Sequence, residues 1–307
     1  MTKVLIATEK PFAEKAVSLI MNVLTGAGFN FFFLERYMHK SDLLKAVVDA
    51  DAMIVRSDIV DEEVLEAAKK IQLVVRAGAG YDNIDIDEAT RRKVAVMNTP
   101  GQNANAVAEL AIGLALYGIR NMFSGASGGE LRGRTLGLHG FGYVARHVKQ
   151  IAEGMGMHVV VFTRHSRELA FSEGLFVTDS LEELYAISDV VSIHVPARDE
   201  HIRSVGFEIL RHLKENAILV NTARKEIINE DDLIHFLRFR PDVKYLSDII
   251  PDHAAEFEKS FKGRYFFTPK KMGAQTAEAN INAGVAAAEQ IVAFFTKNDH
   301  TFQINNF

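Results

Sequence analysis

Short β-rich runs alternate with helical patterns along almost the whole chain of 307 residues. Parallel strands need a long crossover between them, so this alternation is typical of parallel sheets built from βαβ units. We therefore expect an α/β fold with two parallel sheets. The expected strands of the first series are KVLIAT, FNFFFL, AMIV, LVVRAG and VAVMN, and those of the second are RTLGLHGFG, HVVVFT, DVVSIHV, AILVNTA, VKYLSDI and YFFTP.

Two long helical patterns frame the second series. Residues 104–123 are apolar on most faces, which indicates a buried helix and a candidate contact with a second subunit. Residues 277–297 are rich in Ala and other apolar residues. We expect this last helix to return to the first domain.

Composition excludes several classes of protein. A net charge of -5 argues against a general nucleic-acid binder, because binding phosphates needs a basic face. The chain has no cysteine, which excludes disulfides, thiolate zinc sites and cysteine nucleophiles. The start MTKVLIATEKPF turns charged too soon for a signal peptide or membrane span. We expect a cytoplasmic protein with no membrane partner and, since no histidine pair has ligand spacing, no metal.

The stretch TLGLHGFGYVARHV carries the spacing G-x-G-x-x-A at Gly140, Gly142 and Ala145. It follows an expected strand and opens an expected helix. In that setting the glycines let the backbone turn and approach a pyrophosphate, and the helix start supplies N–H groups. We interpret it as dinucleotide-binding, with a tight structural turn as the alternative. The intervening positions placed beside the cofactor are Phe141, Tyr143 and Val144.

The next strand ends on Thr163, followed by Arg164 and His165. Dinucleotide sites usually carry Asp or Glu there to accept hydrogen bonds from the adenosine ribose. Positive residues can accept a 2′-phosphate, so this run favours NADP. A merely solvated Arg164 leaves the choice between NAD and NADP open.

Charged residues also follow the later strands. Ala223 and Arg224 come just after a buried strand, and arginine offers a planar fork that can hold a 2-hydroxy or 2-keto acid. The alternative is a surface arginine. Asp248 ends the next strand and Asp252 lies in its loop. Either could contact the nicotinamide side or orient an acid–base group, and Asp248 could equally cap a turn.

Strands of the first series end in a similar way. Arg56 and Ser57 follow one strand, and Gly78 lies in the glycine-rich run RAGAG after the next. Such loops suit small anions, although arginines here could pair with nearby acids. Together with Arg224 they predict a substrate with two negative ends.

The combination resembles the D-isomer-specific 2-hydroxyacid dehydrogenases. The motifs that carry the resemblance are, in order, VRSDIV, RAGAGYDNID, NTPGQNANAVAEL, GRTLGLHGFGYVAR, VNTARKEIINE and TPKKMGAQTAEAN. They span essentially the full length, and the ordered set is more specific than any single motif. Within the family the chain is most similar to short members that oxidise 3-phosphoglycerate.

The resemblance implies two Rossmann-like, doubly wound parallel-sheet domains. An NAD-binding domain, residues 98–278, is inserted into a discontinuous substrate domain made of residues 1–97 and 279–307. It further implies a homodimer and NAD as the cofactor. The implied reaction is oxidation of 3-phosphoglycerate to 3-phosphohydroxypyruvate in serine biosynthesis.

The family uses an arginine, a glutamate and a histidine in catalysis. Arg224 matches the arginine, whereas His253 occupies the glutamate column and Asp252, one place earlier, is our candidate to replace it. The histidine column falls on Lys271, with Lys270 as an inserted residue, so the resemblance implies a lysine in the acid–base role. The substrate contacts that we carry over or propose are Arg56 and Arg132 for the phosphate, and Ser57, Gly78 and Asn103 near the carboxylate and cofactor.

A lysine amine ordinarily loses its proton near pH 10.4, against about 6.5 for imidazole. We therefore expect oxidation to increase into the alkaline range and reduction to be favoured near neutrality. One alternative is a dehydrogenase of the glyoxylate, hydroxypyruvate or D-lactate type. Another is a corepressor-like, nucleotide-sensing binding protein, which could tolerate an altered catalytic set.

Overall fold

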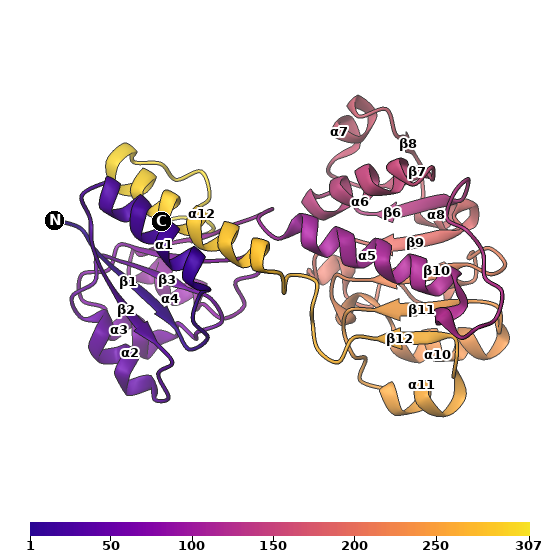
Figure 1. Ribbon diagram of the computed structural model, residues 1–307, viewed down its shortest axis with the longest axis horizontal. Helices are drawn as coiled ribbons and strands as arrows, with labels where there is room; N and C mark the ends of the chain where they lie inside the picture. Colours follow the sequence, from indigo (N-terminus) through magenta and orange to yellow (C-terminus); the bar gives the residue numbers. More distant parts are fainter. The chain divides into compact units, whose positions relative to one another are not determined.

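A computed structural model describes residues 1–307. The chain divides into two compact units, and each contains one of the two parallel sheets expected from the sequence (Figure 1). Unit 1 comprises Met1–Asn103 and Thr276–Phe307, and unit 2 comprises Ala104–Gln275. The functional domain limits given above, at residues 98 and 279, remain a prediction.

Unit 1 is built on five parallel strands in the order β2-β1-β3-β4-β5. Strand β3 is buried at all four positions, as expected for a strand covered on both faces. The strands are β1 (Lys3–Thr8), β2 (Asn30–Glu35), β3 (Ala52–Val55), β4 (Leu73–Arg76) and β5 (Ala95–Asn98). The helices are α1 (Glu14–Gly26), α2 (Lys40–Val47), α3 (Glu62–Ala67), α4 (Ile86–Arg91) and α12 (Ala277–Lys297).

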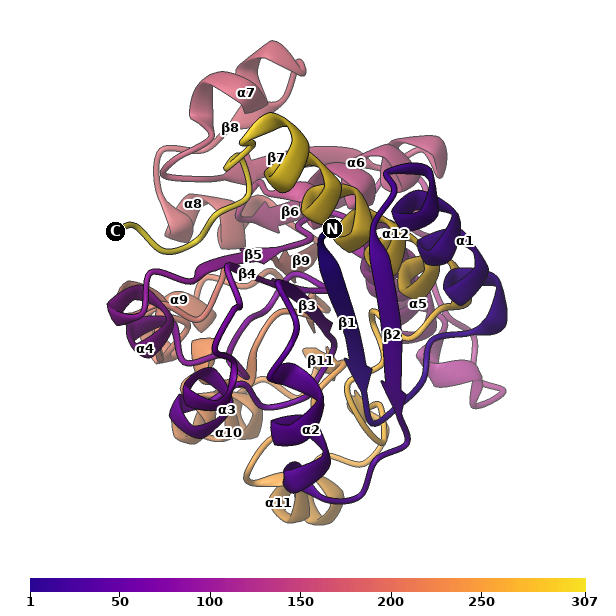
Figure 2. The ribbon, with the colours of Figure 1, turned by 90° about the vertical axis from the view of Figure 1, so that its left-hand side faces the viewer.

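Helices α1 and α12 lie side by side on one face of this sheet, and α2, α3 and α4 cover the other (Figure 2). Helix α12 starts where Thr276 accepts a hydrogen bond from the N–H of Ala279, 3.1 Å away. It approaches α1 closely at Gly284, where an added Cβ would lie 2.9 Å from Ile20 Cδ1. The last helix therefore packs on the first sheet, as its apolar sequence predicts.

Unit 2 contains seven parallel strands in the order β12-β11-β10-β9-β6-β7-β8. They are β6 (Thr135–His139), β7 (His158–Phe162), β8 (Phe176–Val177), β9 (Val190–Ile193), β10 (Ile218–Asn221), β11 (Lys244–Ser247) and β12 (Tyr265–Phe267). Strands β6, β7 and β8 follow one another toward one edge of the sheet, and strands β9 to β12 follow one another toward the opposite edge. The order therefore reverses between β6 and β9, which is where open α/β sheets bind ligands.

Helices cover both faces of the seven-stranded sheet. The α5 and α6 side carries one buried core, and α8 to α11 enclose the other. The helices are α5 (Ala104–Ile119), α6 (Tyr143–Gly154), α7 (Arg167–Ser172), α8 (Leu181–Ile187), α9 (Phe207–Leu210), α10 (Glu230–Phe239) and α11 (Ala254–Ser260), with 3-10 turns at Asn121–Phe123, Asp199–His201 and Lys225–Ile227. No helix has the length and apolar character that crossing a membrane requires.

Candidate active site

A cavity of about 620 Å³ opens at the carboxyl ends of β6, β7 and β9, at the point where the strand order reverses. Its lining includes His139, Gly140, Phe141, Gly142, Thr163, Arg164, His165, His194, Val195, Pro196, Arg198 and His201. Five of the predicted cofactor residues are among them, namely Gly140, Phe141, Gly142, Thr163 and Arg164. Tyr143 and Val144 open helix α6 but are not among the lining residues.

The two glycines of this cavity are required for different reasons. Gly140 has φ +100°, and an added Cβ would lie 2.8 Å from Val195 Cγ1 and 3.0 Å from the His194 carbonyl oxygen. Gly142 has an extended backbone that any residue can adopt, and an added Cβ would meet no protein atom within 4 Å. The first glycine thus permits strands β6 and β9 to approach, whereas the second leaves open space before helix α6.

We expect the two glycines to respond differently to replacement by valine. Gly142→Val should weaken NAD binding by about 100-fold while the melting temperature changes little, because the side chain enters ligand space. Gly140→Val should lower the melting temperature itself, since the new atoms collide with the two residues that follow β9. Calorimetric titration and thermal unfolding measure the two effects. Equal destabilisation by both variants would contradict this division of roles.

The carboxyl end of β7 and the residues after it form another wall of the cavity. Thr163 is buried and its hydroxyl oxygen accepts a hydrogen bond from the N–H of Ser166 at 3.3 Å. Arg164 and His165 are exposed beside it. No carboxylate follows this strand directly, so the structure retains the unusual positive run noted in the sequence.

Two histidines lie at the base of the cavity. His139 is only 4% exposed, and its Nδ1 lies 3.4 Å from the hydroxyl of Tyr185. Burial, with nearby positive groups, lowers the pKa of His139 to about 3. Burial also lowers the pKa of His194 to about 3, and its Nε2 is buried without a hydrogen-bond partner. Both rings are therefore neutral in the folded protein at neutral pH.

These histidines predict a loss of stability in mild acid. Unfolded histidine binds a proton near pH 6.5, whereas the folded sites do so near 3, so the unfolded state holds more protons between these values. The free energy of unfolding should fall as the pH drops through that window, by about 1.4 kcal/mol per pH unit for each site. Urea unfolding at pH 7 and pH 5 should show a smaller fall for His139→Phe than for the wild type. The control His39→Gln, at an exposed position, should show the same decrease in the free energy of unfolding as the wild type. A decrease in His139→Phe as large as that of the wild type would refute the role of His139 in this pH dependence.

Arg224 and Lys271 converge on one backbone oxygen at the same edge of the sheet. Arg224 Nη1 donates to the Ala223 carbonyl oxygen at 3.0 Å, and Lys271 Nζ donates to the same oxygen at 2.5 Å. The turn that presents this carbonyl is fixed by Asn221, whose Oδ1 accepts from the N–H of Ala223 and whose Nδ2 donates to the Arg224 carbonyl, both at 3.0 Å. The structure thus brings together the two residues predicted to bind and deprotonate a hydroxy acid.

Asp248 holds the loop that carries Lys271. Its fully buried carboxylate accepts hydrogen bonds from the N–H of Met272 at 2.6 Å, the N–H of Gly273 at 2.8 Å and the hydroxyl of Thr268 at 3.1 Å. An added Cβ on Gly273 would lie 2.8 Å from Asp248 Oδ2, so this approach requires glycine. These contacts favour the turn-capping interpretation of Asp248 over direct contact with the nicotinamide.

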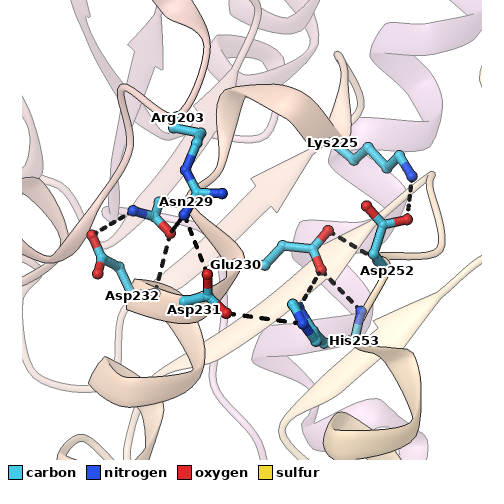
Figure 3. A network of polar contacts seen from close by, with 8 residues as sticks. All are labelled: Arg203, Lys225, Asn229, Glu230, Asp231, Asp232, Asp252 and His253. Atoms are coloured by element: carbon cyan, nitrogen blue, oxygen red, sulfur yellow. Dashed lines mark hydrogen bonds and ion pairs between the residues drawn. The ribbon is translucent and has the colours of Figure 1, made fainter.

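Asp252 is not brought to Lys271. Its carboxylate pairs with Lys225, and its N–H donates to Glu230 Oε1 at 3.0 Å (Figure 3). His253 is held by Glu230 as well, through its N–H at 3.0 Å and its Nδ1 at 3.1 Å. The expectation that Asp252 orients the acid–base residue therefore has no support in this arrangement, because its carboxylate points toward Lys225.

The predicted substrate residues of unit 1 follow neighbouring strands. Arg56 and Ser57 come after β3, Gly78 follows β4, and Asn103 precedes α5. Arg56 donates to the carbonyls of Lys10 and Pro11 and to Asn280 Oδ1, so it also joins the start of α12 to the first loop.

Gly78 accommodates the Arg76 guanidinium. An added Cβ on Gly78 would lie 1.5 Å from Arg76 Nη1, and the glycine has φ +146°. This glycine therefore serves packing within unit 1, in addition to any contact with ligand.

Arg132 lies at the amino-terminal ends of the strands of its sheet, away from the carboxyl ends where the predicted site is located. It precedes β6, and its side chain packs 3.1 Å from the position of a Cβ on Gly156, just before β7. Arg224 follows β10, at the opposite, carboxyl edge of the same parallel sheet. This position does not support Arg132 as a phosphate ligand.

Sequence reasoning missed two groups of residues. Glu230 accepts hydrogen bonds from the N–H groups of Asp252 and His253. In the acidic run NEDDL the sequence does not distinguish it from its acidic neighbours. The cavity wall after β9 was also missed, namely His194, Val195, Pro196 and Arg198. Since DVVSIHV was recognised as a strand beside the switch point, its carboxyl end could have signalled these residues.

A model of the D-isomer specific 2-hydroxyacid dehydrogenase catalytic domain matches residues 6–305. The chain belongs to this family. A crystal structure described as cofactor (NAD+) bound 3-phosphoglycerate dehydrogenase of Entamoeba histolytica is 45% identical, with a TM-score of 0.87, and the match covers 100% of this chain and 99% of that one.

Two of the curated relatives carry names of different activities. D-3-phosphoglycerate dehydrogenase of Methanocaldococcus jannaschii is 32% identical over 267 residues, which are 82% of this chain and 51% of that protein. Glyoxylate reductase of Thermococcus litoralis is 32% identical over 274 residues, 82% of each protein. The chain thus spans about half the length of the first relative and most of the second.

Proposed function

We propose that this dehydrogenase is an NAD-dependent D-3-phosphoglycerate dehydrogenase, oxidising 3-phosphoglycerate to 3-phosphohydroxypyruvate for serine biosynthesis. The observation that carries the proposal is the convergence of Arg224 and Lys271 on the Ala223 carbonyl, in the unit that also holds the glycine-lined cavity. Full-length similarity to the Entamoeba histolytica enzyme supports this substrate. We further propose a cytoplasmic homodimer, for which the apolar surface of α5 is a candidate contact.

The cavity residues fit a dinucleotide. Gly142 leaves open space directly before α6, a helix of 12 residues whose N-cap provides no side chain to its first N–H groups. The buried, unpartnered Nε2 of His194 offers a further polar contact. Bound there, the nicotinamide supplies a hydride acceptor.

Arg224 and Lys271 divide the remaining chemistry. The Arg224 guanidinium binds the substrate carboxylate and stabilises negative charge on the reacting oxygen. The neutral amine of Lys271 takes the proton of the C2 hydroxyl as the carbonyl forms, and its ammonium returns a proton in reduction. Both donate to Ala223 O, so this carbonyl keeps their donor groups at one place.

Unit 1 supplies the proposed contacts to the rest of the substrate. Arg56 is our candidate for the phosphate, because a guanidinium forms strong charge-assisted hydrogen bonds to phosphate oxygens. Ser57, Gly78 and Asn103 remain the candidates near the carboxylate and cofactor. These assignments rest on the sequence match to the family.

A steady-state assay tests the function. Oxidation of 3-phosphoglycerate with NAD should exceed oxidation of unphosphorylated D-glycerate and D-lactate, and reduction of 3-phosphohydroxypyruvate should exceed that of glyoxylate and hydroxypyruvate. The same panel with NADP tests the cofactor choice. Preference for glyoxylate would favour the activity of the Thermococcus litoralis relative. Cofactor binding without turnover of any acid would favour a sensing protein.

A further inference from the structure

A second cavity, of about 240 Å³, lies within unit 1 and is lined by residues that the proposed reaction does not use. Its three walls are the end of β5 with the segment after it, the second half of α12, and the chain beyond α12. The lining residues that carry the argument are Met97, Ala286, Glu289, Gln290, Asp299 and Phe302.

The wall formed by the chain after α12 is fixed in place. The N–H of Ile304 donates to the Val96 carbonyl and the N–H of Val96 donates to Asn305 Oδ1, both at 2.8 Å. Met97 and Gln303 form an antiparallel bridge. Figure 2 shows this yellow segment leaving α12 and returning past β5. The wall after α12 is therefore held against β5 by backbone and side-chain hydrogen bonds.

Gln290 lines the cavity and has a buried side-chain acceptor without a partner. The residue is 8% exposed, and its Nε2 donates to the Asn98 carbonyl at 3.0 Å. Because a carbonyl oxygen can only accept, this bond determines which end of the amide is the nitrogen. Its Oε1 is buried and has no hydrogen-bond partner. A buried acceptor without a donor is costly, so the site favours an occupant with an N–H or O–H group.

The charges of the lining select among such donors. Glu289 and Asp299 are carboxylates, and no lysine, arginine or histidine is among the lining residues. Hydrogen bonds from the Thr301 hydroxyl at 2.6 Å and its N–H at 2.9 Å lower the pKa of Asp299, which keeps it negative. An anion is therefore repelled, and a cation is attracted.

We propose that this cavity is a binding site for a small primary ammonium compound with a short hydrocarbon chain. The ammonium group donates to Gln290 Oε1 and is neutralised by the carboxylates of Glu289 and Asp299. The hydrocarbon part packs on the apolar walls formed by Met97, Ala286 and Phe302. This inference does not depend on the proposed enzymatic function, since no residue assigned to the reaction takes part.

Calorimetric titration with n-butylammonium tests the proposal, with n-butanol and butyrate as the neutral and anionic compounds of the same chain length. At equal, low ionic strength, butylammonium should bind at least about tenfold more tightly than either. Glu289→Gln and Asp299→Asn should each weaken it by about fivefold. Gln290→Met should weaken it as well, and thermal unfolding checks that each variant is folded. The matched control Glu66→Gln, at an exposed position of α3, should have no effect.

Two results would overturn the proposal. One is equal affinity for the three compounds, or affinity for butylammonium that the cavity variants leave unchanged, since binding would then lie elsewhere. The other is a crystal structure, grown with butylammonium, in which only water reaches Gln290 Oε1. Electron density for the ammonium at that oxygen would support the proposal directly.

Discussion

Replacing Lys271 with methionine should lower turnover of 3-phosphoglycerate by about 10³-fold, because methionine approximates the aliphatic part of the lysine side chain but has no amine to exchange a proton. NAD affinity should change little, since the glycine-lined cavity is untouched. Lys270→Met is the matched control, as Lys270 contributes a backbone carbonyl that accepts from the Thr268 hydroxyl at 2.7 Å. Pre-steady-state and steady-state kinetics with both variants measure the effect. A larger loss in Lys270→Met would show that the catalytic lysine has been misassigned.

A second variant at this position tests the role of the amine. In the wild type the oxidation rate should continue to rise in the alkaline range, as expected when a lysine must first lose its proton. Lys271→His should be less active, but its rate should level off at a pH nearer that of imidazole titration. Comparison of kcat against pH, under conditions where chemistry limits, separates proton transfer from positioning. Identical profiles for the two proteins would refute Lys271 as the base.

Asp248→Ala should reduce both stability and catalysis. The N–H groups of Met272 and Gly273 would lose their shared acceptor, at a cost of about 3 kcal/mol in the free energy of unfolding. Turnover should fall by about 10²-fold, because the loop that places Lys271 would no longer be held. Asp248 touches no proposed substrate atom, so we assign it as a positioning residue.

Two comparisons separate positioning from a general loss of folding. Asp248→Asn retains one acceptor oxygen and should recover part of the turnover, with kcat affected more than KM. Asp252→Ala removes a surface ion pair with Lys225 and should change stability by less than about 1 kcal/mol. Loss of NAD affinity in Asp248→Asn, with kcat unchanged, would instead support the earlier interpretation of Asp248 as a cofactor ligand.

The sequence predicted the strands well because their signal is local. The run KVLIAT corresponds to the limits of β1, and AMIV to those of β3, since both are apolar runs that helices cover on each face. The last helix was also predicted at residues 277–297. Strand β8 was missed because it has only two residues, Phe176–Val177, and two residues carry no periodicity.

The site was less predictable because side-chain direction is set by tertiary contacts. The motif placed Gly140 and Gly142 correctly at the cavity, but only the structure distinguishes the packing role of the first from the open space at the second. Arg132 was proposed as a phosphate contact, but it precedes β6, and only the topology shows that this position lies at the amino-terminal ends of the parallel strands. Asp252 lies in the predicted loop, yet Lys225 draws its carboxylate away.

The return of the chain past β5 has a consequence for self-association. Strand β5 is the last in its sheet, and an unpaired strand edge can recruit a strand from another molecule. Ile304 and Asn305 occupy the hydrogen-bonding groups of Val96, and Asn305 Nδ2 also donates to the Val94 carbonyl at 2.9 Å. The backbone N–H of Ile304 and the side-chain amide of Asn305 thereby close this side of the sheet to intermolecular strand addition.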